Sequence, residues 1–103
     1  MVERGDICWC DLEDAGRRPV IVLTRNEAIP ILPRVLVAPI TRRIRNIPTE
    51  VRLGESDGIE ECVINFDDIR PVPRALLSEP ITSLAGSRMH EVCRALAITT
   101  GCP

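Results

Sequence analysis

The apolar residues of this chain lie in short runs separated by proline, glycine and polar residues, and this spacing restricts the fold more than any other feature. The longest uninterrupted runs have about six residues, far fewer than the roughly 20 that a membrane-spanning helix needs. Short runs that recur every eight to twelve residues or so are typical of strands in a small all-β domain. The sequence therefore predicts a mainly β fold.

Six segments carry the strand pattern. They are residues 7–12, 19–24, 35–40, 49–53, 61–67 and 69–73, the last with two prolines that confine it to a sheet edge. The first segment alternates, which predicts a half-buried strand with Cys8 and Ile7 on opposite faces. The second is rich in β-branched residues and is expected to be buried on both faces.

The pattern changes near the end of the chain. Apolar residues from Met89 to residue 100 recur with a helical period, and Gly101 is expected to end that helix. Ser83 and Ser87 are the candidate N-caps. Short strands followed by one helix predict a small, curved, mostly antiparallel barrel, with residues 1–103 forming a single domain.

Charge and the first residues narrow the function. The formal net charge is −2, so any nucleic-acid binding must come from a local basic patch. All 13 basic residues are arginines. A G+C-rich genome explains most of this bias; the functional alternative is that arginine suits bidentate phosphate contacts, and the positions of the arginines must decide between the two. The opening "MVERGD" is charged and no apolar run follows it, so no signal peptide is expected and the cytosol is the expected compartment.

Metal and cofactor chemistry find little support in the sequence. The five cysteines form no C-x-x-C motif, and with the single His90 their spacing does not suit zinc. In a reducing cytosol they are expected to behave as small hydrophobic residues. Neighbouring acids such as Asp67 and Asp68 point to opposite faces of a strand and are not expected to hold one ion together. No metal and no cofactor are predicted.

The densest positive charge follows the third predicted strand. In "RVLVAPITRRIRNIPTEV", residues 34–51, the apolar run ends at Thr41 and is followed by Arg42, Arg43 and Arg45. Runs of charged residues most often form solvated loops, and this is one interpretation of the arginine-rich segment. The other is that the arginines form a phosphate-binding patch. Because Trp9 and Phe66 are the only aromatic residues, nucleic acid would be held mainly through phosphate contacts and hydrogen bonds, not by a stacking platform.

Several motifs occur in the order and spacing found in a known family. "RGDICWCDL", "RRPVIVLTRN", "VLVAPIT" and "VINFDDIR" resemble the MazF/PemK-like toxins of bacterial toxin–antitoxin systems, and "ITSLAGSRMHEVCRAL" resembles that family's closing strand and helix. The most specific feature is R-P-V followed about twenty residues later by P-I-T at a strand end. The resemblance covers essentially the whole chain.

The resemblance implies a fold and an activity. The fold is a small SH3-like antiparallel β-barrel with a C-terminal α-helix, as in the MazF/CcdB-like plasmid-maintenance toxins. The activity is a metal-independent, sequence-specific endoribonuclease acting on single-stranded RNA, with Arg18 and Thr41 matching the family's usual catalytic pair. In some branches an acid in the later strand motif is catalytic, with an arginine two residues before it. Asp67 matches that acid, but Asn65 stands where the arginine would be.

The chemistry of the residues agrees with this activity. RNA cleavage without a metal uses the substrate's 2′-OH as nucleophile, so the protein must orient the phosphate and stabilise charge. Arginine is a poor general base, so we expect Arg18 to stabilise the phosphorane and donate a proton, and Thr41 to donate to a non-bridging oxygen. The expected RNA-binding residues are Arg17, Arg42, Arg43, Arg45, Asn65 and Asp67.

The family also implies partners: a second copy of the chain in a homodimer, and a cognate antitoxin whose acidic, partly disordered segment lies over the RNA groove. Two alternatives remain at this stage. One is a non-catalytic toxin of the same superfamily that poisons a topoisomerase by binding. The other is a small-barrel interaction domain. The R-P-V and P-I-T motifs together favour the endoribonuclease over both.

Overall fold

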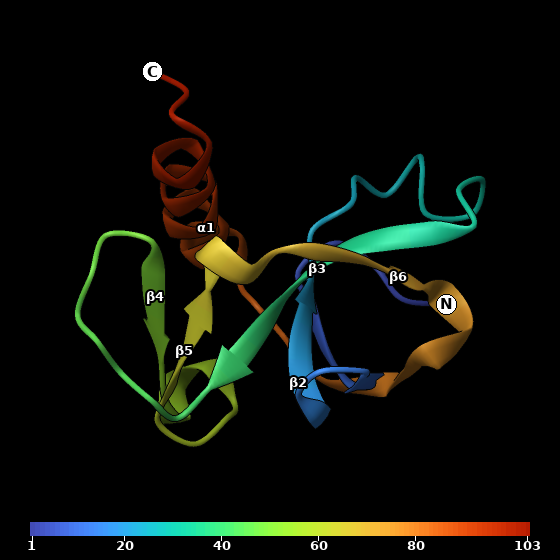
Figure 1. The fold of residues 1–103 in the computed structure, drawn as a ribbon, viewed down its shortest axis with the longest axis horizontal. Coiled ribbons are helices and arrows are strands. Elements are labelled where there is room, and N and C mark those ends of the chain that lie inside the picture. The colour runs from blue at the N-terminus through green and yellow to red at the C-terminus, as the bar shows by residue number, and fades with distance from the viewer.

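The computed structural model describes all 103 residues and has seven strands and one long helix (Figure 1). In chain order the elements are β1 (Asp6–Leu12), β2 (Gly16–Val22), β3 (Arg34–Thr41), β4 (Glu50–Leu53), β5 (Cys62–Asn65), β6 (Arg70–Pro73), β7 (Leu77–Ser83) and α1 (Gly86–Thr100). The predicted mainly β fold with a C-terminal helix is confirmed. No helix has the length and apolar character needed to cross a membrane.

All seven strands belong to one antiparallel sheet that curls but does not close. The order of pairing is β4-β5-β3-β2-β1-β7, and β6 pairs with β3 beside β5. One edge of β3 is thus shared by β6, which pairs with its first half, and β5, which pairs with Ile40 and Thr41 at its end. A 3₁₀ turn at Phe66–Asp68 separates β5 from β6 and bends the chain around this edge. The end of β3 therefore lies beside β5, which in turn pairs with β4 on its other side.

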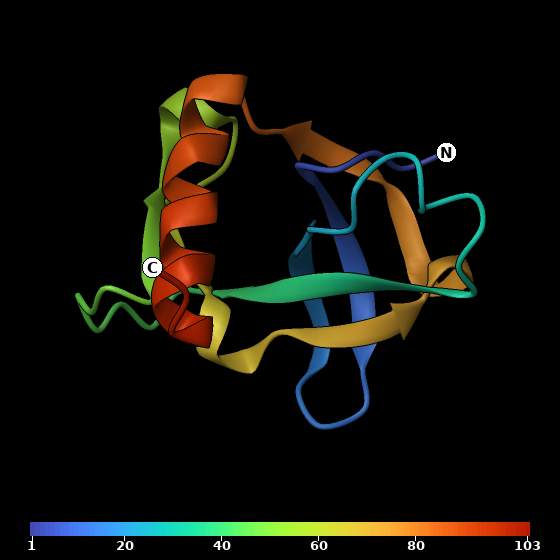
Figure 2. The ribbon, with the colours of Figure 1, turned by 90° about the horizontal axis from the view of Figure 1, so that it is seen from above.

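Two hydrophobic clusters lie on opposite faces of the central strands. Neighbouring residues go to different clusters: Ile21 joins the cluster under α1, whereas Val20 and Val22 join the other. This arrangement explains why the second segment is apolar on both faces, as predicted. On β1 the prediction of a half-buried strand was partly wrong, because Ile7 is fully buried as well as Cys8. Ile7 belongs to the same cluster as Val92 and Ala95 of α1. Figure 2 shows α1 lying beside β4.

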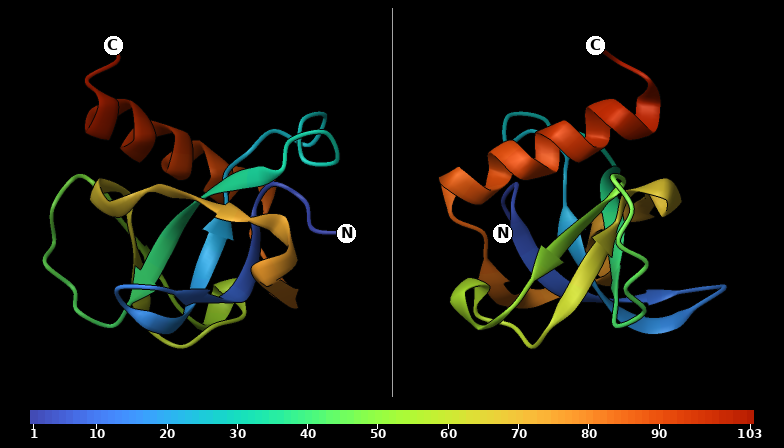
Figure 3. Two further views of the ribbon diagram at one scale, coloured as in Figure 1. Left: turned by 45° about the vertical axis from the view of Figure 1, so that its right-hand side comes forward. Right: turned by 90° about the vertical axis from the view of Figure 1, so that its left-hand side faces the viewer.

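The helix α1 packs across β4 and the 3₁₀ turn that follows β5 (Figure 3). Val92 and Ala95 are its buried residues, whereas Cys93 is exposed, so the apolar stripe is narrower than the sequence suggests. The N-cap is Ala85 and no side chain caps the helix, so both serine candidates were wrong. Gly101 ends the helix in the left-handed conformation, with φ of 71°, as predicted.

The seventh strand has no clear pattern in the sequence and was expected only from the family resemblance. β7 pairs with β1 alone, with register shifts on both sides of Cys8, and contains Pro80. A bulged edge strand needs neither strict alternation nor a full set of backbone donors, which explains why its residues do not stand out.

Candidate functional site

Two adjoining hollows lie where β2 begins and β3 ends. The larger has a volume of about 530 Å³ and the smaller about 330 Å³. Arg18, Thr41 and Arg43 line both, so these three side chains form the wall that the hollows share. We call the two hollows together the groove. The sequence places these residues far apart, and the pairing of β2 with β3 brings them together.

Arg18 lies on β2 and faces Thr41 on β3. The antiparallel register pairs Val20 with Pro39, and continued by two residues it sets Arg18 opposite Thr41. The Nε–H of Arg18 donates to the carbonyl oxygen of Ala15, at 3.2 Å. This bond uses the inner edge of the guanidinium group and leaves both terminal nitrogens free to bind a ligand as a fork.

Thr41 ends β3, and its hydroxyl is ordered by the backbone. The N–H of Arg43 donates to Thr41 Oγ1 at 3.2 Å, in a local turn typical of threonine. The hydroxyl hydrogen has no acceptor within the protein. Since one lone pair is occupied and the hydrogen is free, Thr41 can donate a hydrogen bond into the groove.

The arginines around the groove differ in how far their charge is compensated. Arg18 and Arg43 take part in no ion pair. Arg42 pairs with Glu60 at 2.9 Å, but both side chains are more than four-fifths exposed. Arg17 lies 5.5 Å from the ring centre of Trp9. The uncompensated positive charge is therefore concentrated on the shared wall, where an anion is stabilised most.

Arg45 is the most firmly held of these arginines. Its Nε–H and backbone N–H donate to the carboxylate of Glu50, at 2.8 and 2.9 Å, and its Nη2 donates to Asn65 Oδ1 at 3.2 Å. Burial opposes ionisation of Glu50, but the hydrogen bonds and charge of Arg45 outweigh it and lower the pKa of Glu50. Arg45 and Asn65 both line the smaller hollow.

Asp67 is the expected RNA-binding residue that the structure does not bring to the groove. Its Oδ2 accepts a hydrogen bond from Thr49 Oγ1 at 2.7 Å, which turns the carboxylate toward the segment before β4. Its neighbour Asp68 lines the smaller hollow instead. The 3₁₀ turn is responsible, because adjacent residues in such a turn point in different directions, as they do in a strand.

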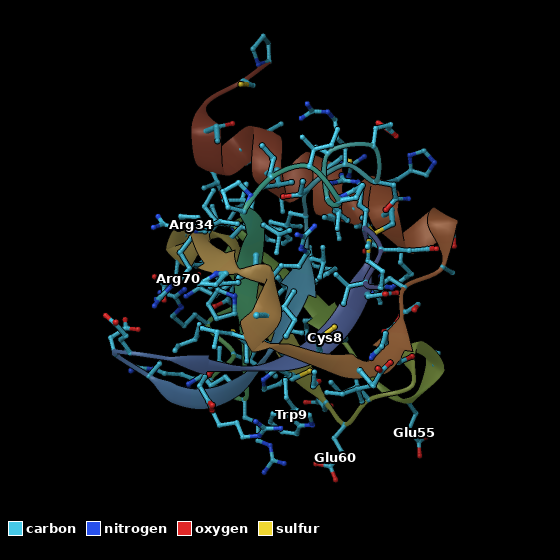
Figure 4. All side chains as sticks on the ribbon, turned by 90° about the vertical axis from the view of Figure 1, so that its right-hand side faces the viewer. Cys8, Trp9, Arg34, Glu55, Glu60 and Arg70 are labelled. Atoms are coloured by element: carbon cyan, nitrogen blue, oxygen red, sulfur yellow. The ribbon has the colours of Figure 1, made fainter.

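Trp9, Glu60, Glu61 and Ile81 line the larger hollow, and sequence reasoning assigned none of them to a site. Figure 4 shows Trp9 and Glu60 on the same side of the molecule. Trp9 is 39% exposed. The strand alternation that buries Cys8 and Cys10 was the available signal, because it sends Trp9 to the opposite side.

The side chains usual in nucleophilic or metal chemistry are not gathered at the groove. Cys62 lines the larger hollow, but burial raises the pKa of its thiol, so it stays protonated at neutral pH. Burial likewise raises the pKa of Cys8 to about 11. His90 is exposed on α1, and no three His, Cys, Asp or Glu side chains come together as metal ligands. The polar side chains that line the groove are arginines, the hydroxyl of Thr41, the amide of Asn65 and the carboxylates of Glu60, Glu61 and Asp68.

Comparison with known proteins gives one consistent family. Residues 3–100 match the model of the PemK-like, MazF-like toxin of type II toxin–antitoxin systems. The chain is similar to the probable endoribonuclease MazF5 of Mycobacterium tuberculosis, with 43% identity over 101 residues that cover 96% of this chain and 93% of the relative. It is also similar to the probable endoribonuclease MazF2 of the same species, with 37% identity over 103 residues, covering 98% of this chain and 100% of the relative.

Solved structures agree with the fold. An endoribonuclease in complex with its cognate antitoxin, from a mycobacterial species, superposes with a TM-score of 0.91 at 27% identity, covering 100% of this chain and 98% of the other. The M. tuberculosis toxin MazF-mt6 superposes with a TM-score of 0.87 at 29% identity, covering 95% and 98%. The similarity therefore extends over both whole chains.

Proposed function

The chain belongs to the PemK-like, MazF-like toxin family of type II toxin–antitoxin systems, and on this premise we propose that it is an endoribonuclease that cleaves single-stranded RNA at preferred short sequences. Residues 1–103 act as one toxin domain. The relatives named as endoribonucleases support the activity, and their coverage of this chain supports its extension to the whole domain.

One observation carries the proposal. Arg18 and Arg43, the two arginines at the groove that take part in no ion pair, share a wall with the free hydroxyl of Thr41. Two uncompensated forks and a neutral donor suit one phosphodiester, which presents two non-bridging oxygens and a negative charge. The alternative for residues 42–45 was a solvated loop with no binding role. That alternative gives no reason for the Thr41 hydroxyl to line the groove between two unpaired arginines.

The proposed reaction is attack of the RNA 2′-OH on the adjacent phosphorus. The bond from the 2′ oxygen to phosphorus forms, the bond from phosphorus to the 5′ oxygen breaks, and a proton passes from the 2′-OH side to the leaving oxygen. Arg18 stabilises the charge of the phosphorane and Thr41 donates to a non-bridging oxygen. The products are a 2′,3′-cyclic phosphate and a 5′-hydroxyl.

The other residues at the groove bind the flanking RNA. Arg17, Arg42 and Arg45 contact neighbouring phosphates, and the amide of Asn65 contacts a base or ribose. The partly exposed ring of Trp9 offers a face on which one base stacks. Asp67, bonded to Thr49, supports the turn beside the groove and does not join the chemistry.

The partners follow from the charge of the groove and from the family. We infer that a cognate antitoxin covers the groove with an acidic, partly disordered segment, whose carboxylates take the place of RNA phosphates on the arginines. The toxin acts in the cytosol, as a homodimer. Light scattering on the purified chain tests the dimer, and displacement of labelled RNA by the antitoxin tests the shared groove.

Incubation of the purified chain with long RNA and EDTA tests the activity. We expect cleavage at a small set of sequences, and downstream fragments that a kinase can label without prior phosphatase treatment. Intact RNA across several substrates and protein concentrations contradicts the nuclease and favours a toxin that acts by binding. A 5′-phosphate on the downstream fragment contradicts 2′-OH attack, since it means that water was the nucleophile.

A further inference from the structure

Arg70, the first residue of β6, connects two other segments beside the groove: the β1–β2 turn and the 3₁₀ turn that contains Asp68. Its two terminal nitrogens donate to the two carboxylate oxygens of Asp14, the second pair at 3.1 Å, and Nη2 also donates to Asp68 at 2.7 Å. The side chain of Arg70 is only 21% exposed and lines neither hollow. These contacts raise the pKa of Arg70 and lower that of Asp14, so both stay charged at neutral pH.

Asp14 lies in the turn between β1 and β2, next to the residue that orients Arg18. The carbonyl of Ala15 accepts the Nε–H of Arg18 at 3.2 Å. A continuous path of contacts therefore runs from Arg70 through Asp14 and the backbone of the turn to the guanidinium group of Arg18.

The ends of the turn are fixed by the pairing of Leu12 with Gly16, and Ala15 packs against the cluster that contains Cys8 and Cys10. The side chain of Asp14, however, has no hydrogen-bond or ion-pair partner other than Arg70. Glu13, Asp14 and Gly16 are exposed, and only Ala15 is partly buried. Its backbone makes one bond across the turn, from Ala15 N–H to Leu12 O at 3.3 Å. A turn tip with so little buried surface is expected to move unless polar contacts restrain it, and the forked bond from Arg70 is the only side-chain hydrogen bond that ties this tip to a strand other than β1 and β2.

We propose that Arg70 is a positioning residue for RNA cleavage: through Asp14 it holds the β1–β2 turn where the Ala15 carbonyl can orient the Arg18 fork. This inference rests on the proposed function, because it assigns Arg18 its role at the scissile phosphate. Arg70 itself touches no substrate. Replacement of Arg70 leaves the charge of Arg18 in place, but the Arg18 side chain is then no longer held in one orientation.

Arg70→Gln and Asp14→Asn test the proposal, with Arg34→Gln as the matched control. Arg34 is an exposed arginine at the other end of the β3–β6 pair and takes part in no ion pair (Figure 4). Arg34→Gln removes one positive charge, as Arg70→Gln does, but breaks no such contact. We expect both test variants to lower the single-turnover cleavage rate by roughly tenfold to a hundredfold, the range for a small displacement of a catalytic group. Affinity for RNA with a 2′-deoxy residue at the cleavage site should change less than twofold or so.

A double-variant cycle separates positioning from a general structural effect. In an Arg18→Ala background, Asp14→Asn should lower the residual rate no further, because the group that it positions is absent. Arg70→Lys should recover only part of the rate, since an ammonium group cannot make the forked bond. Rate losses that multiply in the double variant, or a wild-type rate in both single variants, overturn the proposal.

The NMR signal of the Arg18 Nε–H gives a readout that needs no activity. We expect slow exchange with water in the wild type and in Arg34→Gln, and faster exchange in Asp14→Asn and Arg70→Gln. Unchanged exchange in both test variants overturns the proposed path. If the wild type leaves RNA intact while this signal behaves as expected, the nuclease proposal fails and the restraint on Arg18 stands.

Discussion

Two Arg–Glu pairs near the groove have nearly the same N···O distance but very different burial, and this difference predicts different losses of stability for the same substitution. Glu50 pairs with Arg45 at 2.8 Å and its side chain is 2% exposed; Glu60 pairs with Arg42 at 2.9 Å and its side chain is 82% exposed. Replacing each glutamate with glutamine removes one charge with almost no change in shape. We expect Glu50→Gln to destabilise the fold strongly and Glu60→Gln hardly at all.

The expected magnitudes follow from the contacts. Glu50 accepts two hydrogen bonds from Arg45, one from its side chain and one from its backbone. Hydrogen bonds to charged groups contribute about 1.5–3 kcal/mol each, and glutamine keeps one acceptor of the two. The free energy of unfolding should therefore fall by about 2–3 kcal/mol, which corresponds to a decrease in Tm of roughly 10–20 °C for a domain of this size. The exposed pair should contribute about 0.5 kcal/mol or less.

The pH dependence of stability independently tests whether ionised Glu50 stabilises the fold. The pKa of Glu50 is lowered in the folded state, so the unfolded chain binds its proton more readily. The stabilisation is therefore complete above the unfolded pKa of about 4.3 and is lost as the pH falls through the lower folded pKa. The difference in stability between wild type and Glu50→Gln should be full at pH 7 and shrink below about pH 4.

Urea unfolding followed by circular dichroism measures these differences, at one protein concentration because a dimer couples stability to concentration. Equal losses in Glu50→Gln and Glu60→Gln would refute the argument from burial. A loss in Glu50→Gln that stays constant from pH 7 to pH 3 would refute the assignment of the effect to the ionised carboxylate.

Three further predictions concern the groove. Arg18→Lys and Thr41→Ala should each lower the cleavage rate by about 10²–10³ with little change in stability; a lysine variant as active as the wild type in a fluorogenic RNA assay would contradict the forked contact. A single 2′-deoxy residue just 5′ of the scissile phosphate should block cleavage there and leave binding almost unchanged, as a gel with labelled RNA would reveal, because affinity resides mainly in phosphate contacts. Arg43→Ala should reduce the slope of log affinity against log salt by about one, and Arg42→Ala by less, because Glu60 already compensates Arg42; equal slopes in filter-binding titrations would argue against this difference.

Local patterns in the sequence were enough to predict most of the fold. The β-branched run of β2, the turn residues between strands and the helical period from Met89 each depend on neighbours within a few positions, so they can be recognised without the tertiary structure. The helix start was mispredicted, since Ala85 has no side chain that could signal a cap. β7 was missed by pattern alone because an edge strand with bulges follows no strict alternation.

The residues of the candidate site also fall into two groups: those that the sequence could predict and those that only the tertiary structure brings to the groove. Arg18, Thr41 and Arg43 could be named from the sequence because they lie at the ends of recognisable strands within two motifs. Trp9 and Arg70 could not. Alternation indicates only that Trp9 faces away from Cys8 and Cys10, whereas the pairing of β1 with β2 sets it opposite Pro19 at the groove. Arg70 acts on a turn 56 positions away. A local pattern reports which side chains share a face of one element. Which of them meet across elements, and which arginines keep a free charge, depends on strand pairing and on the carboxylates that the fold brings within reach.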